Sequence, residues 1–239
     1  MNRTFISIDW DYFVPEKVDW DFGHKETKAF LHFIWKTRFS AYDKMRTNGT
    51  EAGFWDNLKR SYKLPDVIDV SDSHLSAYEN MSLHLSDTLI LIDRHHDVYT
   101  LPSKVPIDCG NWVAAWLDAN KNRHCYWVAP KDVESTYMMP RYKKRVTVVK
   151  EIPILDDVWV TGLHACRSGC WTPPWLDEAF NRFIDASGCI PEASQLDWCD
   201  PLRTRFNLKD YREGFAIEYS RRKMNLEFMH QYPHLKVIG

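Results

Sequence analysis

The chain has 239 residues, and its 31 Lys and Arg side chains nearly balance 33 Asp and Glu for a net charge of −2. This balance excludes binding of nucleic acid through bulk positive charge. The longest apolar runs are far shorter than the roughly 18 residues of a membrane helix, and the first residues lack a secretory hydrophobic region. We expect one cytoplasmic α/β domain over residues 1–239, with no nucleic-acid or membrane partner and an oligomeric state left open.

The six cysteines are spread over a long chain, which argues against a disulfide framework. A zinc knot built from the last four would need paired cysteines two residues apart, and their spacing differs. These four are Cys166, Cys170, Cys189 and Cys199. We expect most cysteines to be buried as small apolar side chains.

Short apolar runs alternate with helical patterns along the chain. The runs predict strands at residues 4–8, 67–70, 88–92, 125–128, 146–149 and 158–161. The patterns predict helices at residues 25–48, 53–62, 75–83, 111–120, 174–186 and 209–222, with a continuation of the last to 229 left open. Strand and helix in alternation predict an open, mostly parallel α/β sheet with helices on both faces. Functional residues are then expected just after the strands.

Acidic residues follow the first predicted strand. Ser7, Asp9 and Asp11 are two residues apart, so in extended chain they project to one face. Neighbouring carboxylates repel each other unless a cation neutralises them. The alternative is an ordinary strand that ends in a solvated acidic turn.

Two further strands end in potential ligands. Asp93, His95 and Asp97 follow the strand at 88–92 with the same spacing of two, and His74 follows the strand at 67–70. Taken by itself, His74 is better explained as a helix-capping or surface residue, because Asp72 or Ser73 would start a helix there. Because several strands end this way, a shared metal site becomes the favoured interpretation.

The combined set holds four carboxylates and two imidazoles, more than one catalytic zinc ion takes. Oxygen-rich mixed sites favour manganese or a similar six-coordinate ion. Two ions that share bridging carboxylates would use all six side chains and would activate a water molecule for hydrolysis. The candidate ligands are Asp9, Asp11, His74, Asp93, His95 and Asp97.

The sequence resembles the arginase-like ureohydrolases, and most closely an arginase-related family that includes the peptide arginases of ribosomal natural-product pathways. The resemblance lies in short islands between residues 5 and 174: Ser7-Ile8-Asp9-Trp10-Asp11-Tyr12-Phe13, Asp93-Arg94-His95-His96-Asp97, Gly110-Asn111-Trp112, Arg167-Ser168-Gly169 and Thr172-Pro173-Pro174. It implies an arginase/deacetylase-like three-layer sandwich, with the strand order permuted because Asp-x-Asp precedes Asp-x-His-x-Asp here. It also implies two Mn²⁺ ions and hydrolysis of arginine side chains in a precursor peptide to ornithine and urea.

The resemblance assigns a role to each ligand. Asp93 and Asp9 would bridge the two ions, His95 would bind one ion and Asp97 the other, Asp11 would be a terminal ligand, and His74 would match the family's histidine motif. Free-arginine enzymes hold the α-carboxylate of the substrate with an Asn two residues beyond Asp-x-His-x-Asp, where this chain has Tyr99. Loss of that contact agrees with a peptide substrate and equally with another guanidine.

Catalytic and substrate-binding residues follow less directly. His164 and His96 are candidates for delivering a proton to the leaving amine, and each could equally be structural. Trp10 and Tyr12 could stack on the guanidinium or the peptide, as could Trp112 and Trp171. A carboxylate must hold the guanidinium; the candidates are Glu178, Asp108, Asp177 and Glu79.

Three alternatives remain open at this point. The first is a single-zinc deacetylase or amidohydrolase that uses a subset of the ligands. The second is a ureohydrolase that acts on a small guanidine. The third is a non-catalytic relative that binds peptide through its aromatic residues. No role is assigned to residues 190–239.

Overall fold

A single parallel sheet forms the centre of the protein. The computed structural model describes residues 1–15, 35, 44–133 and 137–193. The sheet has the order β5-β4-β3-β1-β6-β2-β7, and all its neighbouring strands are parallel. The strands are β1 (Asn2–Asp9), β2 (Val67–Ser71), β3 (Thr88–Ile92), β4 (His124–Val128), β5 (Val146–Val149), β6 (Val158–Cys166) and β7 (Ile190–Ala193). The open, parallel α/β sheet predicted from the sequence is confirmed.

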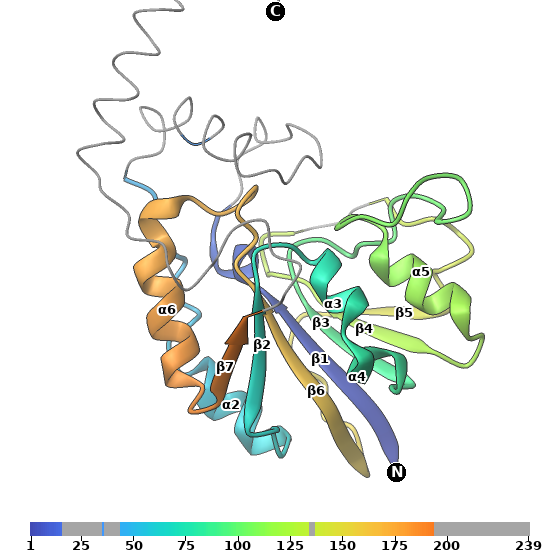
Figure 1. Ribbon diagram of the computed structural model, residues 1–239, viewed down its shortest axis with the longest axis horizontal. Helices are drawn as coiled ribbons and strands as arrows, with labels where there is room; N and C mark the ends of the chain where they lie inside the picture. Colours follow the sequence, from blue (N-terminus) through green and yellow to red (C-terminus); the bar gives the residue numbers. More distant parts are fainter. Residues whose placement is uncertain (16–34, 36–43, 134–136, 194–239) are drawn as a thin grey trace, which may run out of the picture.

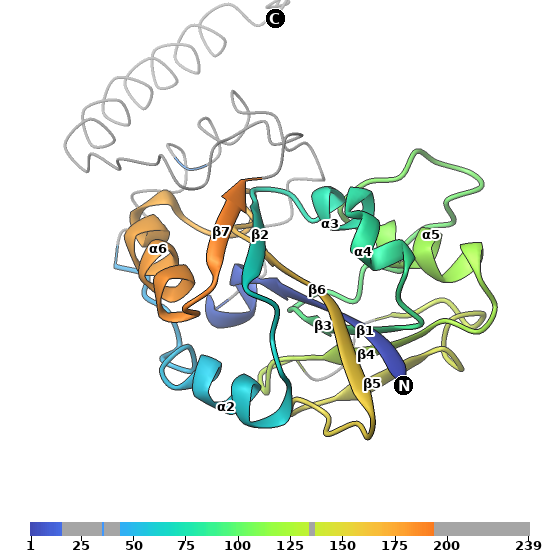
Figure 2. The same ribbon diagram turned by 60° about the horizontal axis from the view of Figure 1, so that its bottom comes forward.

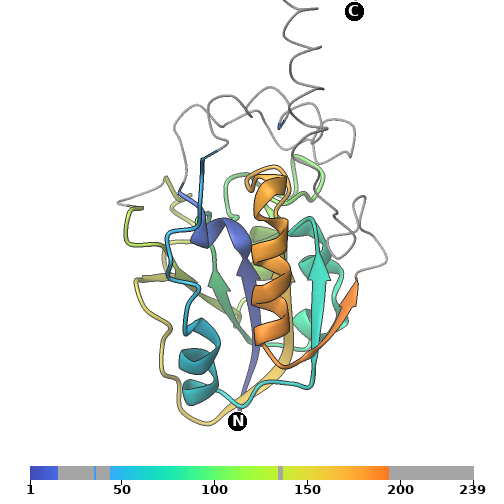
Figure 3. The ribbon, with the colours of Figure 1, turned by 90° about the vertical axis from the view of Figure 1, so that its left-hand side faces the viewer.

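Helices cover both faces of this sheet (Figure 1). Helices α2 (Phe54–Ser61) and α6 (Asp177–Ala186) pack on one face; α3 (Leu75–Glu79), α4 (Met81–His84) and α5 (Trp112–Ala119) pack on the other (Figure 3). Side chains that alternate along the central strands separate the two cores. Ile6 and Ile8 of β1 face the first pair of helices, whereas Phe5 faces the second group. Burial on both faces explains why these strands read as continuous apolar runs.

Several predicted elements differ in extent. The helix expected at 75–83 is broken at Asn80, whose extended backbone separates α3 from α4 and whose side chain caps α4 by accepting from Ser82 N at 2.8 Å. The helix expected at 174–186 begins with the 3-10 turn η3 (Pro174–Leu176). Strand β6 continues five residues past the predicted end at Thr161, and β7 was not predicted.

Two other predicted helices concern residues with little or no description. The helix at 209–222 lies outside the described residues, and so does most of the one at 25–48, whose last residues from 44 on form a turn and irregular chain. None of the helices in the described part of the chain combines the length and the apolar character needed to cross a bilayer.

The strand order determines where a site can form. β1 lies between β3 and β6, and β6 separates it from β2 (Figure 2). The chain therefore leaves β1 for β2 on one side and then crosses to β3 on the other. Such a reversal brings the carboxyl ends of strands from both sides together with loops that diverge, and sites of open α/β sheets form there.

Candidate metal centre

The end of β1 supplies the first two carboxylates. β1 ends at Asp9, and the chain turns at once into the 3-10 helix η1 (Trp10–Phe13). Asp9 caps this turn, because its Oδ1 accepts a hydrogen bond from Asp11 N at 2.9 Å. Asp11 therefore reaches the site from a turn and not from the extended chain that the spacing of two suggested. Both carboxylates are buried.

The loop after β3 supplies the next three side chains. Strand β3 ends at Ile92, so Asp93, His95 and Asp97 lie in an irregular loop and not along a strand face. The backbone of His95 donates to Asp93 Oδ1 at 2.7 Å. Asp97 has a left-handed φ of 51°, which Asp tolerates better than most residues, and Trp112 Nε1 donates to its Oδ2 at 2.6 Å. These contacts turn the loop back over the sheet edge.

His74, the residue before α3, meets three of these carboxylates. Its Nδ1 lies 3.2 Å from Asp9 Oδ2, 3.1 Å from Asp93 Oδ2 and 3.2 Å from Asp97 Oδ2. The ring is buried, and Trp112 packs at 5.3 Å between ring centroids. Three strand ends thus bring three predicted carboxylate ligands around one nitrogen atom of a fourth predicted ligand, His74.

Asp93 belongs to a second group as well. His95 Nδ1 lies 2.9 Å from Asp11 Oδ2 and 3.7 Å from Asp93 Oδ1. Asp93 therefore directs one oxygen toward His74 and the other toward His95. The ligand atoms of Asp11, Asp93 and His95 and those of His74, Asp93 and Asp97 form two groups that could each hold a metal ion. All six predicted ligands are brought together, and Asp93 is common to both groups.

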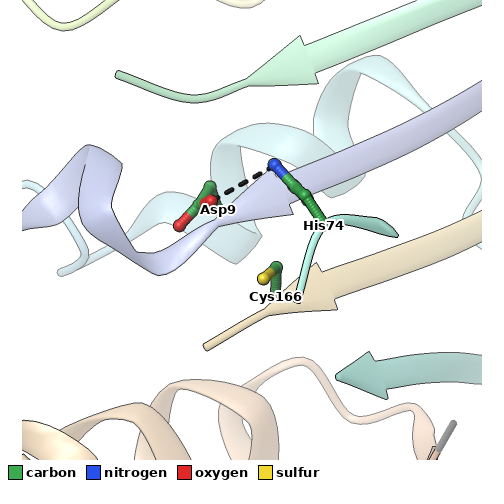
Figure 4. A group of neighbouring side chains, drawn as sticks. All are labelled: Asp9, His74 and Cys166. Atoms are coloured by element: carbon green, nitrogen blue, oxygen red, sulfur yellow. Dashed lines mark ion pairs between the residues drawn. The ribbon is translucent and has the colours of Figure 1, made fainter. Parts of the chain in front are cut away.

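A third group includes a residue that was not predicted as a ligand. Cys166, the last residue of β6, lies beside Asp9 and His74, and the three ligand atoms fall within 4.8 Å of one another (Figure 4). The prediction treated this cysteine as an apolar core residue. The strand register explains its position, because Cys166 pairs with Asp9 in the parallel ladder of β1 and β6.

The crowding of buried carboxylates in the cluster favours the binding of positive charge. Burial and the neighbouring Asp11 raise the pKa of Asp9 well above its ordinary value. Burial and nearby carboxylates raise the pKa of Asp93 to about 8. The pKa of His74 is also raised well above its ordinary value, because the surrounding carboxylates outweigh burial. The metal-free protein therefore holds protons where carboxylates crowd.

The donor atoms fit divalent ions. Asp11 Oδ2 and Asp93 Oδ2 are buried and have no well-directed hydrogen bond, although histidine nitrogens lie within 3.1 Å of each. Buried carboxylate oxygens normally accept hydrogen bonds or bind metal. Oxygens with one imidazole in each group suit six-coordinate ions such as Mn²⁺. The second bridging role expected for Asp9 stays a prediction, since its contact is to the His74 group.

Arg94 stabilises the edge of the site through contacts with Asp11 and Asp132. Its backbone N donates to Asp11 Oδ1 and its Nε to Asp11 O, both at 3.4 Å, while its guanidinium pairs with Asp132 at 2.9 Å. The arginine is buried although it lies between two predicted ligands in sequence. It ties the loop after β3 to the turn after β1.

The two predicted proton carriers have structural contacts instead. His96 Nε2 donates to Tyr137 O at 2.8 Å and its Nδ1 accepts from Val98 N at 3.2 Å, so both ring nitrogens are used away from the ligands. His164 lies inside the extended β6, is buried, and contacts Ser7 Oγ and Ser71 Oγ. Burial and the nearby His74 lower the pKa of His164 well below its ordinary value. Neither geometry suits proton delivery to a substrate.

The predicted substrate-binding aromatics divide into two kinds. Trp10 is only 1% exposed and packs on Phe13, Phe180 and Phe183, so it belongs to the core. These ring contacts place it in the core, away from the ligands. Trp112 is likewise buried, where it orients Asp97. Tyr12 is partly exposed and packs on Phe13. Trp171 is partly exposed beside His95, with 4.8 Å between ring centroids.

The candidate guanidinium-binding carboxylates have other places. Glu178 is exposed on α6 and pairs with Arg182 at 2.7 Å, and Glu79 is exposed at the end of α3. Asp108 accepts from Gly110 N in the loop before α5. Asp177 is buried and pairs with Arg167 at 2.5 Å. None of these contacts involves a predicted ligand.

Arg167 links the two loops that flank β2 and β6. Its guanidinium lies between Asp72 at 2.8 Å and Asp177 at 2.5 Å, and its backbone N donates to Ser71 O at 2.7 Å. A Cβ at Gly169 would lie 2.9 Å from Arg167 Nη1 and from the Asp72 carboxylate, so a larger residue there would have to displace this ion pair. This buried pair fixes the segment that leads into His74.

Comparisons with protein-family models, with curated proteins and with solved structures found no match for this chain.

Proposed function

We propose that this protein is a binuclear, Mn²⁺-dependent hydrolase. The observation that carries the proposal is the position of Asp93, whose two carboxylate oxygens face two separate ligand groups. A carboxylate shared in this way is the usual link between paired ions. The His74 group would hold one ion with Asp97 and Asp9, and the His95 group would hold the other with Asp11.

The charges of the centre support two ions and not one. Four carboxylates with neutral imidazoles carry about four negative charges, which two divalent ions would balance. A single ion would leave surplus negative charge buried, and such charge is costly. When bound, the pair lowers the pKa of a water molecule and stabilises negative charge that develops in the transition state.

We further propose that the substrate is the guanidinium group of arginine side chains in a peptide, with ornithine and urea as products. A charge-balanced centre would not repel a cationic guanidinium. The C=N carbon of the guanidinium is attacked only by a strong nucleophile, such as a water molecule activated by two metal ions. The partly exposed Trp171 beside His95 offers a ring on which the planar cation can stack. Tyr99, partly buried beside His96, occupies the position at which the free-arginine enzymes carry an Asn.

The chain's own residues divide the remaining work. Arg94 and Trp112 hold the Asp11 and Asp97 side chains in place, and Trp171 orients the substrate beside His95. Because His96 and His164 are committed to other contacts, we assign the proton for the leaving amine to solvent and not to these histidines.

The test is an assay of Mn²⁺-loaded protein with an arginine-containing peptide, free arginine and agmatine in parallel. The proposal expects urea release and a mass decrease of one CH₂N₂ unit per arginine in the peptide. The Asp93→Asn variant should abolish both, whereas Asp87→Asn, which changes a surface ion pair with Arg3, should leave them unchanged. Product from agmatine alone would contradict the peptide substrate, and no product from any guanidine would contradict the ureohydrolase.

One observation favours a second candidate, a zinc-dependent amidohydrolase. Cys166 lies with Asp9 and His74, and a thiolate ligand prefers zinc to manganese. Three protein ligands would also match a catalytic zinc site. Metal analysis separates the candidates, because the second predicts one zinc ion per chain and a Cys166→Ala variant that no longer binds it.

A further inference from the structure

A chain of buried hydroxyl and imidazole groups runs behind His74, on the side away from the carboxylates. His74 Nε2 lies 3.3 Å from Ser7 Oγ, Ser7 Oγ lies 2.9 Å from His164 Nδ1, and His164 Nε2 lies 2.8 Å from Ser71 Oγ. All four side chains are buried. The groups come from β1, β6, the end of β2 and the residue before α3, so the central strands hold them in register.

Ser71, the last residue in this series of contacts, fixes the direction of the hydrogen bonds. Ser71 Oγ donates its single proton to Ser73 O at 2.8 Å. A hydroxyl has one donor, so Ser71 must accept at its contact with His164 Nε2. His164 meets serine hydroxyls at both ring nitrogens, and among the described residues no carboxylate forms a hydrogen bond or ion pair with its ring. The neutral ring therefore carries its proton on Nε2.

The same reasoning carries the direction forward to His74. With its proton on Nε2, His164 accepts at Nδ1, and the donor is Ser7 Oγ. Ser7 has then used its only proton, so at its second contact it accepts from His74 Nε2. The hydrogen-bond network thus assigns the ring tautomer, which is the way such tautomers are determined. Nδ1 of a neutral His74 is left without a proton and faces three carboxylates.

We propose that Ser7, His164 and Ser71 are positioning residues that hold His74 as the Nε2-protonated tautomer and so present its bare Nδ1 to a divalent ion. The inference rests on the metal centre proposed above and extends it to residues that bind neither ion nor substrate. A bare nitrogen facing carboxylate oxygens at 3.1 to 3.2 Å is repulsive without a cation and favourable with one. Hydrogen bonds to the second ring nitrogen of metal-binding histidines commonly act in this way.

The consequence is selective for one ion. Ser7→Ala removes the acceptor for His74 Nε2, so the tautomer with its proton on Nδ1, aimed at the carboxylates, becomes favoured. Loss of such a partner weakens metal binding by about 10- to 100-fold. The ion of the His74 group should therefore bind that much more weakly, while the ion of the His95 group keeps its affinity. Ser71→Ala should act in the same direction, because without the Ser71 acceptor His164 can carry its proton on Nδ1 and reverse the hydrogen bonds to Ser7 and His74.

Two measurements test the proposal. The first is the ring ¹⁵N spectrum of the metal-free wild-type chain, in which His164 should carry its proton on Nε2; a proton on Nδ1 would overturn the proposal without reference to metal. The second is Mn²⁺ titration of the wild type, Ser7→Ala, Ser71→Ala and Ser86→Ala. Ser86 is the matched control, since it is a buried serine that donates to Leu83 O at 2.6 Å away from the ligands.

The outcomes separate this inference from the function on which it rests. Two ions in wild type and Ser86→Ala, with one weakened in Ser7→Ala, support it. If Ser7→Ala binds both ions as tightly as wild type, the inference is wrong and the metal centre stands. If Ser86→Ala weakens the same ion equally, the effect is general destabilisation and the inference is also wrong. If the wild type binds no ion, the metal centre itself is wrong, and this inference is wrong with it.

Discussion

Replacing Asp93 with asparagine should stabilise the metal-free protein while removing its response to metal. Asparagine keeps the shape of the side chain in the buried cluster of carboxylates and cannot ionise. The folded protein raises the pKa of Asp93 from 3.8 to about 8, so near pH 7 the side chain is held neutral in the fold and is ionised when unfolded. This difference opposes folding.

The size of the effect follows from that pKa. Between 3.8 and pH 7, each pH unit costs about 1.4 kcal/mol, which gives on the order of 4 kcal/mol. The asparagine variant avoids this cost. For a chain of this size, 1 kcal/mol shifts the unfolding midpoint by about 2 to 4 °C, so Asp93→Asn should raise the midpoint of the metal-free protein by about 10 °C.

The assay is thermal unfolding followed by circular dichroism, with EDTA and then with excess Mn²⁺. Wild type should unfold early in EDTA and gain stability from Mn²⁺, whereas Asp93→Asn should unfold late in EDTA and gain nothing. Asp87→Asn serves as the control, because an exposed pair is worth at most about 1 kcal/mol. If Asp93→Asn is less stable than wild type in EDTA, or still gains stability from Mn²⁺, the reasoning about this cluster is wrong.

Three further predictions follow from the same contacts. His95→Ala should leave one Mn²⁺ per chain in equilibrium dialysis, because the His74 group does not contain His95; retention of both ions would contradict the two groups. In denaturant titrations, the metal-free protein should lose stability from pH 6 to 9. The pKa values of Asp9, His74 and Asp93 are raised in the fold, so the folded protein retains protons that the unfolded chain releases, and the stability from these protons is lost as pH rises. The metal-loaded protein should lose less, and an equal loss in both would refute this cause. Arg167→Met should cost about 3 to 5 kcal/mol in urea unfolding, because it leaves Asp72 and Asp177 buried without the guanidinium between them; a loss under 1 kcal/mol would show that the pair does not hold the loop.

The side chains that gather at this edge of the sheet could be predicted from the sequence because strand ends are visible in it. An apolar run buried on both faces fixes where a strand stops, and in a parallel sheet the stops of β1, β2 and β3 meet at one edge. The detailed reason was only partly right. Asp11 and the Asp93–Asp97 loop reach the site through turns, and the spacing of two did not place them along extended strands.

The supporting residues could not be predicted in the same way. The roles of His96 and His164 depend on hydrogen-bond partners that lie 41 and 157 residues away along the chain, at Tyr137 and Ser7. The core position of Trp10 likewise depends on its packing against Phe180 and Phe183, which are distant in the sequence. Cys166 was missed because β6 continues to Cys166, whereas the predicted strand ended at Thr161.

The number and identity of the bound metal ions test the central claim most directly. Purified protein, stripped with chelator and reloaded in separate samples with Mn²⁺ and with Zn²⁺, can be desalted and analysed by inductively coupled plasma mass spectrometry. The shared position of Asp93 between the His74 and His95 groups predicts about two manganese ions per chain. One zinc ion per chain with no retained manganese, or no retained metal, would contradict it.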